Sequence, residues 1–331
     1  MKEKEVRNEK DDPQGKALPE VMLPIIAQLK VDRKYAAAHV YRSVLRSVGR
    51  FAGNDIPVDA LFQPGMLKAY ENWLRGSQAS WSTVSTYVRT LRAAYNRVVP
   101  PGTVGHNPKL FEDVHTKVDS YTKRALTEEQ MQTLMEADIT KLPQGVQCAL
   151  AYSLLMFLFR GMAYIDLTQL QKGDVRGNFI TYCRHKTGRQ ITVRIPPEAM
   201  PLLEEFRNTN PDSIYLFPIL DAPTGNRKRR TDEELYQDYL RALRSFNKKL
   251  ARIAALLLPG TKLSSYTSRH TWATLAYYNN VNIGIISKAL GHSSIKVTEN
   301  YLKPFNNEKV DSVNDELISS VLRSKQNREV A

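Results

Sequence analysis

A Pro-Pro-Gly break at positions 100–102 separates two parts of the chain whose hydrophobic patterns differ. Proline cannot extend a helix and glycine permits a tight turn, so regular structure is expected to end at this point. The 331 residues are enough for two domains that each bury a core. We therefore predict a first domain over residues 17–105, a linker over 106–122 and a larger second domain over 123–305.

The part before the break has the 3.6-residue period of amphipathic helices. Helices are expected over residues 35–51, 66–74 and 82–98, and Ser80 or Ser82 can cap the last of them. Several arginines fall away from the apolar faces of the first and third helices; they include Arg42, Arg46, Arg89 and Arg92. This domain is predicted to be small, helical and basic.

The part after the break combines helices with a short pair of strands. Residues 146–159 are almost wholly apolar, which predicts a buried central helix. Strands are expected over 179–183 and 191–195, joined by a turn at Lys186. Further helices are expected over 235–258, 272–278 and 283–290. The predicted fold class is mostly α with a small antiparallel β-sheet in the C-terminal domain, an α+β arrangement.

The two ends of the chain differ from the domains between them. Residues 1–16 are polar and are predicted to form a disordered tail. Residues 306–331 form a C-terminal tail with apolar side chains at helical spacing. These side chains are Val310, Val313, Leu317, Val321 and Leu322. The simplest prediction for this stripe is that it packs on its own domain.

The overall charge favours a polyanionic partner. The formal net charge is +13 and the isoelectric point is about 9.6, as expected for a protein that binds nucleic acid. No apolar run reaches the ~18 residues of a membrane span, and the charged residues 1–5 do not resemble a secretory signal. Cys148 and Cys183 make neither a disulfide framework nor a zinc site. A location in the reducing cytoplasm is therefore expected.

The last third of the chain contains an arginine, a histidine and a late tyrosine, namely Arg269, His292 and Tyr301. Attack on a phosphodiester needs a nucleophile and groups that neutralise charge on the non-bridging oxygens. Arginine can hold two oxygens in its planar fork, and tyrosine can form a covalent phosphotyrosine. The sequence has no Walker loop, no dinucleotide fingerprint and no acidic set with metal-ligand spacing. These residues predict DNA breakage without a metal or cofactor.

Residues 264–274, the Leu-Gly-His sequence at 290–292 and Tyr301 resemble the tyrosine recombinase, or phage-type integrase, family. The resemblance extends over about 18–305. It implies a helical, SAM-like core-binding domain and a catalytic domain that together clamp double-stranded DNA. It also implies site-specific recombination (integration, inversion or resolution) through a 3′-phosphotyrosine, carried out by a homotetramer on two DNA sites. An accessory DNA-bending protein is left open as a further partner.

The family pattern assigns a role to several residues of this chain. Tyr301 would be the nucleophile that becomes linked to a 3′ phosphate, and Arg269 would bind a non-bridging oxygen. His292 would hydrogen-bond the scissile phosphate, and Lys186 would protonate the leaving 5′ oxygen from a flexible hairpin tip. Tyr266 stands where the family usually has histidine. A phenol can donate a hydrogen bond to the phosphate but cannot shuttle a proton near neutral pH as histidine can.

The first arginine of the family pattern is missing. A Gly-Leu-Arg sequence, with an acidic residue three positions after the arginine, aligns here with Gly161-Met162-Ala163 and Asp166. Arg160 lies three residues before Ala163, about one helical turn away, and shares its face if the helix continues. We predict that Arg160 reaches the same phosphate and that Asp166 orients an arginine.

Other basic residues are also expected to contact DNA. Arg184 and Arg189 share the hairpin with Lys186 and are predicted, with the helix arginines above, to bind DNA.

Two alternatives to recombination remain open. Strand relaxation of the type IB topoisomerase kind would use the same chemistry. Ala163 and Tyr266 also allow a DNA-binding protein that has lost catalysis.

The resemblance also bears on assembly and location. No separate arm-site-binding domain is expected ahead of residue 17. The tail over 306–331 would dock on a neighbouring subunit, and the protein would be found on the nucleoid.

Overall fold

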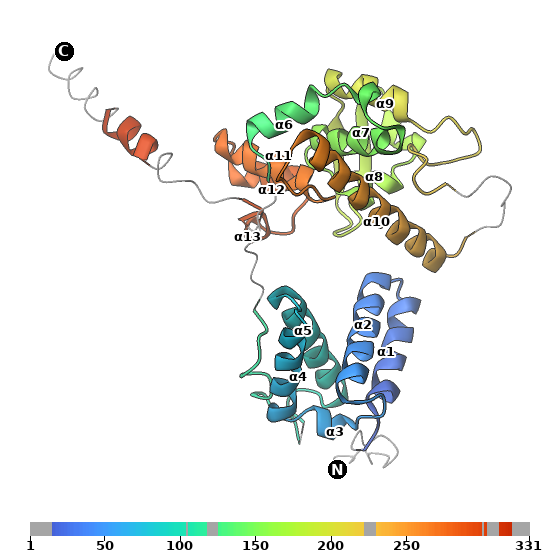
Figure 1. Ribbon diagram of the computed structural model, residues 1–331, viewed down its shortest axis with the longest axis vertical. Coiled ribbons are helices and arrows are strands. Elements are labelled where there is room, and N and C mark those ends of the chain that lie inside the picture. The colour runs from blue at the N-terminus through green and yellow to red at the C-terminus, as the bar shows by residue number, and fades with distance from the viewer. Residues whose placement is uncertain are drawn as a thin grey trace, which may run out of the picture. The chain divides into compact units, whose positions relative to one another are not determined.

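The computed structural model describes residues 15–103, 105–117, 125–221, 230–299, 301–302 and 311–319. These residues form two compact units (Figure 1). The N-terminal unit holds the described residues up to 117 together with Arg230–Tyr236, and the C-terminal unit holds the others. Most of the predicted tail over 1–16 lies outside the described residues.

The N-terminal unit is built from helices that pack around one apolar core. They are α1 (Leu18–Val31), α2 (Tyr35–Ala52), α3 (Val58–Leu61), α4 (Pro64–Gly76) and α5 (Trp81–Val98). Helix α1 packs along α2, and α5 contacts α1, α2 and α4. The hydroxyl of Ser80 accepts a hydrogen bond from the backbone N–H of Thr83, so Ser80 caps α5 as predicted. The sequence patterns predicted α2, α4 and α5 but not α1, which contains Pro24.

The predicted linker over 106–122 begins too early in the chain. Leu110, Phe111 and Val114 are buried in the core of the N-terminal unit. These apolar residues lie in an irregular stretch without helical or strand periodicity, so the pattern gave no sign of their burial. The rest of the predicted linker, from residue 118, lies outside the described residues.

The C-terminal unit combines helices with a small antiparallel sheet. The α-helices are α6 (Glu128–Met135), α7 (Gln144–Leu158), α8 (Tyr164–Gln169), α9 (Met200–Phe206), α10 (Asp232–Leu257, which belongs to this unit from Gln237 on), α11 (Thr267–Tyr278), α12 (Ile283–Ala289) and α13 (Ile295–Glu299). Short 3-10 turns are η2 (Ile139–Lys141), η3 (Lys172–Asp174) and η4 (Pro197–Ala199). The sheet has the order β1 (Val175–Arg176), β2 (Phe179–Cys183), β3 (Gln190–Arg194). This matches the predicted fold class.

Helix α7 lies in the core of the C-terminal unit. It is apolar on nearly every face and contacts α6, α8, α9 and α11. The adjacent helix α10 begins with a capping box, because Thr231 Oγ1 accepts from Glu234 N at 3.2 Å and Glu234 Oε2 accepts from Thr231 N at 2.7 Å. Among the described residues, no helix has the length and apolar character needed to cross a membrane.

The segment between α7 and α8 is a bend, so the condition on which Arg160 and Ala163 would share a helix face is not met. Helix α7 ends at Leu158, and Arg160 (φ 59°) and Gly161 (φ 68°) are both left-handed. Ala163 is the extended N-cap of α8. Arg160 and Ala163 therefore do not share a helix face. A side chain at Gly161 would meet the Cα of Arg269 at 3.2 Å, so glycine allows α11 to approach the bend closely.

Candidate active site

Arg269 lies at the centre of the candidate active site, and its side chain is almost completely buried. It stands in the first turn of α11, where its guanidinium joins separate segments of the chain. Nη1 donates to the carbonyl oxygen of Gly161 at 2.7 Å, and Nη2 donates to that of Leu290 at 2.5 Å. Nη2 also lies 3.0 Å from Nε2 of His292. Arg269 thus ties the α7–α8 bend to the loop after α12.

His292 is buried and neutral in this arrangement. Its Nε2 faces the guanidinium of Arg269, which can only donate, so Nε2 accepts. Nδ1 therefore carries the proton and donates to Thr298 Oγ1 at 2.8 Å. Burial, followed by the positive charges of Arg269, Arg184 and Lys186, lowers the pKa of His292 to about 3. Thr298, which is fully buried, was not identified from the sequence because a threonine in a helix has no distinctive pattern.

The side chain of Tyr301 lies beside those of Arg269 and His292. Its ring centroid is 4.8 Å from that of His292 and 4.7 Å from that of His270, and Arg269 Cζ is 5.5 Å from its ring centroid. The backbone carbonyl of Tyr301 accepts from Nδ1 of His270 at 3.3 Å and from Thr274 Oγ1 at 3.4 Å. The structure therefore brings together the predicted tyrosine, arginine and histidine in one place.

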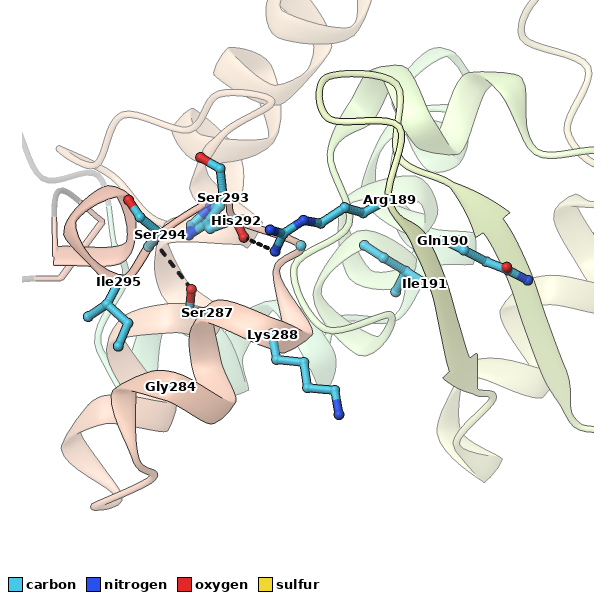
Figure 2. A pocket seen from close by; sticks show the side chains of 11 residues that line it. Arg189, Gln190, Ile191, Gly284, Ser287, Lys288, His292, Ser293, Ser294 and Ile295 are labelled. Atoms are coloured by element: carbon cyan, nitrogen blue, oxygen red, sulfur yellow. Dashed lines mark hydrogen bonds between the residues drawn. The ribbon is translucent and has the colours of Figure 1, made fainter.

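The β2–β3 hairpin is held against the loop at Gly291 and His292. Arg184 Nη1 donates to the carbonyl oxygen of Gly291 at 2.7 Å, and Thr187 Oγ1 donates to the same oxygen at 3.3 Å. Arg189 reaches across to the carbonyl oxygen of His292 (Figure 2). Lys186 was expected on a flexible tip, but these three hydrogen bonds anchor the turn that carries it. Its own side chain is exposed.

The two hairpin arginines differ in exposure. Arg184, which was predicted to bind DNA, is only 4% exposed. Its burial follows from the hydrogen bond to Gly291, since the side chain turns inward against the loop. Arg189 is exposed and its guanidinium is bound to His292 at one nitrogen. A pocket of about 370 Å³ lies beside this contact, with Ser287 and Lys288 of α12 on its wall (Figure 2).

Asp166 binds the hairpin backbone and not an arginine side chain. Its Oδ1 accepts from the backbone N–H of His185 at 2.8 Å, while Oδ2 is buried without a hydrogen bond among the described residues. Burial, which outweighs this hydrogen bond and the nearby arginine charges, raises the pKa of the carboxyl group. The carboxylate that was expected to orient an arginine therefore fixes the position of the hairpin.

The remaining predicted site residues lie toward the edge of the site. Tyr266 is the half-exposed N-cap residue of α11, and its ring centroid is 6.4 Å from that of His270. Arg160 is partly exposed, and its Nη1 lies 3.4 Å from the carbonyl oxygen of Thr192 in β3. The structure thus places Arg160 beside the sheet.

The predicted DNA-binding arginines of the N-terminal unit are exposed on two of its helices. Arg42 and Arg46 lie on α2, and Arg89 and Arg92 lie on α5. None of them forms an ion pair with a carboxylate in the part of the chain that the structure describes. Their charge is therefore available to a polyanion.

A buried arginine and histidine beside a tyrosine, on a helical domain with a small sheet, define a class of enzyme that cuts and rejoins DNA through a tyrosine. Residues 124–308 match the Phage integrase family, and residues 20–114 match the Phage integrase SAM-like domain. The chain belongs to the phage integrase family. The resemblance and the predicted fold class are thereby confirmed. Membership of the phage integrase family favours site-specific DNA recombination over topoisomerase-like relaxation and over DNA binding without cleavage.

Individual relatives agree with this assignment. The chain is similar to a tyrosine recombinase of Thermosipho africanus, with 23% identity over 244 residues that cover 72% of this chain and 78% of the relative. Tyrosine recombinase XerA of Pyrococcus furiosus is 25% identical over 237 residues, which cover 70% of this chain and 72% of XerA.

Solved structures show the same fold at low identity. The Tn1549 transposon integrase in complex with a circular intermediate DNA superposes with a TM-score of 0.62 at 15% identity, covering 91% of this chain and 99% of that chain. A lambda integrase dimer bound to a COC′ core site gives a TM-score of 0.57 at 16% identity, with 91% and 81% coverage.

Proposed function

We propose that this protein recombines double-stranded DNA at specific sites through a 3′-phosphotyrosine at Tyr301. The observation that carries the proposal is the position of the Tyr301 ring, 5.5 Å from the guanidinium carbon of Arg269 and 4.8 Å from the ring of His292. A nucleophile and two phosphate-binding groups lie together in one chain. The similarity to the Tn1549 transposon integrase supports a role in a mobile element.

Tyr301 acts as the nucleophile in an exchange of phosphoester bonds. Its phenolic oxygen loses its proton and attacks the scissile phosphorus, the bond to the 5′ oxygen breaks, and that oxygen leaves as a hydroxyl after taking up a proton. A 5′ hydroxyl from a second strand reverses the step and releases Tyr301. One phosphoester replaces another each time, so the reaction needs no nucleotide energy source.

Arg269 and His292 stabilise the charge that develops on the phosphate. Arg269 is buried, and a fixed cation in a dry site stabilises a developing anion more than it would in water. His292 donates to the phosphate from Nε2 in its other neutral tautomer. The hydroxyl of Thr298 can donate as well as accept, so it can satisfy Nδ1 in either tautomer.

Lys186 and Tyr266 complete the proposed site. Lys186 is exposed at a turn anchored to Gly291, so its ammonium group can meet the leaving 5′ oxygen of a bound strand. Tyr266 is half-exposed at the start of α11, from where its phenol can donate a hydrogen bond to the phosphate.

The N-terminal unit contributes to DNA binding through backbone phosphates. Arg42, Arg46, Arg89 and Arg92 are exposed on α2 and α5 and supply this contact. Together with Arg189 on the hairpin, they position the duplex without reading its sequence. We place the working enzyme in the cytoplasm on the nucleoid, where its duplex substrate is found, with an accessory DNA-bending protein as a further partner.

The working assembly is a homotetramer on two DNA sites. Residues 311–319 are helical and exposed, with Val313 50% and Ile318 49% exposed. Apolar side chains at this exposure on a helix favour docking on a neighbouring copy of the chain. A crystal structure of a lambda integrase tetramer bound to a Holliday junction is among the solved structures similar to this chain.

The proposal is tested by denaturing capture of protein-linked DNA from cells that express the chain, followed by sequencing of the trapped ends. Tyr301→Phe, which keeps the ring but removes the nucleophile, is the control. Recurrent ends that vanish in the control are expected and define the target site. Ends that persist at the same positions with Tyr301→Phe would contradict the proposal.

A further inference from the structure

Arg184 is a second buried arginine at the candidate active site. It directly follows β2 and is 4% exposed, compared with 2% for Arg269. Within the described part of the chain, its side chain donates one hydrogen bond, from Nη1 to the carbonyl oxygen of Gly291. Its Nε is buried without a partner there, and the same is true of Nε of Arg269. Such orphaned donors on buried cations are costly unless a ligand supplies an acceptor.

The two guanidinium groups face the same loop. Arg269 donates to the carbonyl oxygen of Leu290, and Arg184 donates to that of the next residue, Gly291. After burial, the charge of Arg184 is the main reason why the pKa of Arg269 is lowered. Like charges placed this close repel one another, and a bound anion relieves the repulsion.

No carboxylate in the described residues neutralises this pair by a direct contact. Asp166 is the nearby acid, but its Oδ1 binds the backbone N–H of His185 and its Oδ2 has no partner in that part of the chain. Neither Arg184 nor Arg269 forms an ion pair among the described residues. Buried charges are normally paired, so an anion bound here would be stabilised by both guanidinium groups.

We propose that Arg184 binds a non-bridging oxygen of the scissile phosphate. It would thereby supply the positive charge of the first arginine of the family pattern, which is replaced here by Ala163. This inference rests on the proposed function, since it assigns a second phosphate-binding residue to the same site. Arg269 holds the phosphate from α11, and Arg184 holds it from the β2–β3 hairpin. The side chain of Arg184 fits because position 291 is glycine: a Cβ there would lie 3.1 Å from Arg184 Cδ.

Arg160, the alternative from the sequence, is less suited to this role. It belongs to the left-handed bend after α7 and is partly exposed. Its guanidinium lies 3.4 Å from the carbonyl oxygen of Thr192 in β3, whereas Arg184 binds the residue next to His292. Arg184 also donates to a backbone carbonyl, so an experiment must separate phosphate binding from a role that only positions the loop.

The experiment uses Arg184→Gln, because glutamine keeps an N–H donor for the carbonyl of Gly291 but carries no charge. Arg160→Gln is the matched control. Covalent complex formation is measured on a nicked suicide duplex that carries the captured target site. A second duplex has a methylphosphonate at the scissile position, where a methyl group replaces one non-bridging oxygen and removes the charge. Circular dichroism and thermal melting check that each variant folds.

A phosphate-binding role for Arg184 predicts a defect that depends on the charge of the linkage. Arg184→Gln should lower the cleavage rate about 100-fold or more on the normal duplex. On the methylphosphonate duplex, the gap to the unaltered protein should shrink to about 10-fold or less, because less charge develops there. Arg160→Gln should cleave the normal duplex within a few-fold of the unaltered protein.

Other results would overturn the inference. Equal defects on both duplexes would assign Arg184 to loop positioning alone, and normal cleavage by Arg184→Gln would remove it from the site. If Arg184→Gln does not fold, Arg184→Met, which is also uncharged, is measured instead. A defect that is larger on the normal duplex than on the methylphosphonate duplex supports phosphate binding by Arg184, while equal defects on both duplexes, or normal cleavage, oppose it. Failure of the proposed function looks different, since the unaltered protein would then form no Tyr301-dependent complex on either duplex.

Discussion

Arg269 Nη2 lies 3.0 Å from Nε2 of His292, so a buried cation donates to a neutral imidazole at the centre of the site. The pKa of His292 is lowered from 6.5 to about 3, chiefly by burial and then by three nearby positive charges. The imidazole therefore remains neutral at every pH at which the enzyme is expected to work, and it serves as a hydrogen-bonding group rather than as a charge on the phosphate.

The neutral state of His292 makes the free protein sensitive to acid. Between pH ~6.5 and ~3 the unfolded chain binds a proton at this residue and the folded chain does not, so stability falls as the pH is lowered through this window. His292→Asn removes this titration. We expect the variant to be less stable than the unaltered protein at pH 7.5, with a deficit that shrinks at pH 5. Thermal melting at both pH values checks this, and a deficit that grows at pH 5 would contradict it.

Gly291 is predicted to tolerate no side chain. Its φ is 64°, and a Cβ would lie 2.7 Å from Ile191 Cδ1 and 3.1 Å from Arg184 Cδ. Gly291→Ala should therefore destabilise the fold by roughly 1–3 kcal/mol, through backbone strain and overpacking of the hairpin. Gly173→Ala is the matched control because a Cβ there would meet open space. Denaturant unfolding measures both variants, and equal stability of the two would show that the hairpin is not packed as described.

The exposed arginines on α5 should act through salt-dependent binding to DNA phosphates. For the double variant Arg89→Ala, Arg92→Ala, the slope of log affinity against log salt should become less steep by about 0.9 for each phosphate that the variant no longer binds. Arg207→Ala is a suitable control, because Arg207 is also exposed but is paired with Glu204 at 2.9 Å. Fluorescence anisotropy with duplex DNA at several salt concentrations gives the slopes. A slope unchanged from that of the unaltered protein would exclude phosphate binding by Arg89 and Arg92.

The regular elements could be predicted from the sequence where one periodic signal dominated. Helices α2 and α5 have an apolar face that repeats every 3.6 residues, and the β2–β3 hairpin alternates apolar and polar residues around a turn. The cap at Ser80, one of the two serines expected there, marks the start of α5. The buried stretch at Leu110 and Phe111 had no periodicity, so it was mistaken for a linker.

The details of the site depended on contacts that local patterns do not encode. The sequence motif predicted that Arg269, His292 and Tyr301 belong to one site, and the structure places them side by side. The bend at Arg160 could not be foreseen, because a left-handed arginine is uncommon and the preceding residues favour a helix. The burial of Arg184 could not be predicted, since arginine in a hairpin is usually exposed. Its burial arises only when the hairpin docks on the loop after α12.

The central claim is tested most directly by finding which residue carries the DNA. The covalent complex, trapped on a suicide duplex and digested with nuclease and protease, would be analysed by mass spectrometry. We expect the nucleotide, joined through its 3′ phosphate, on the peptide that contains Tyr301. A nucleotide on another tyrosine, such as Tyr266 at the start of α11, or a linkage through a 5′ phosphate would contradict the account.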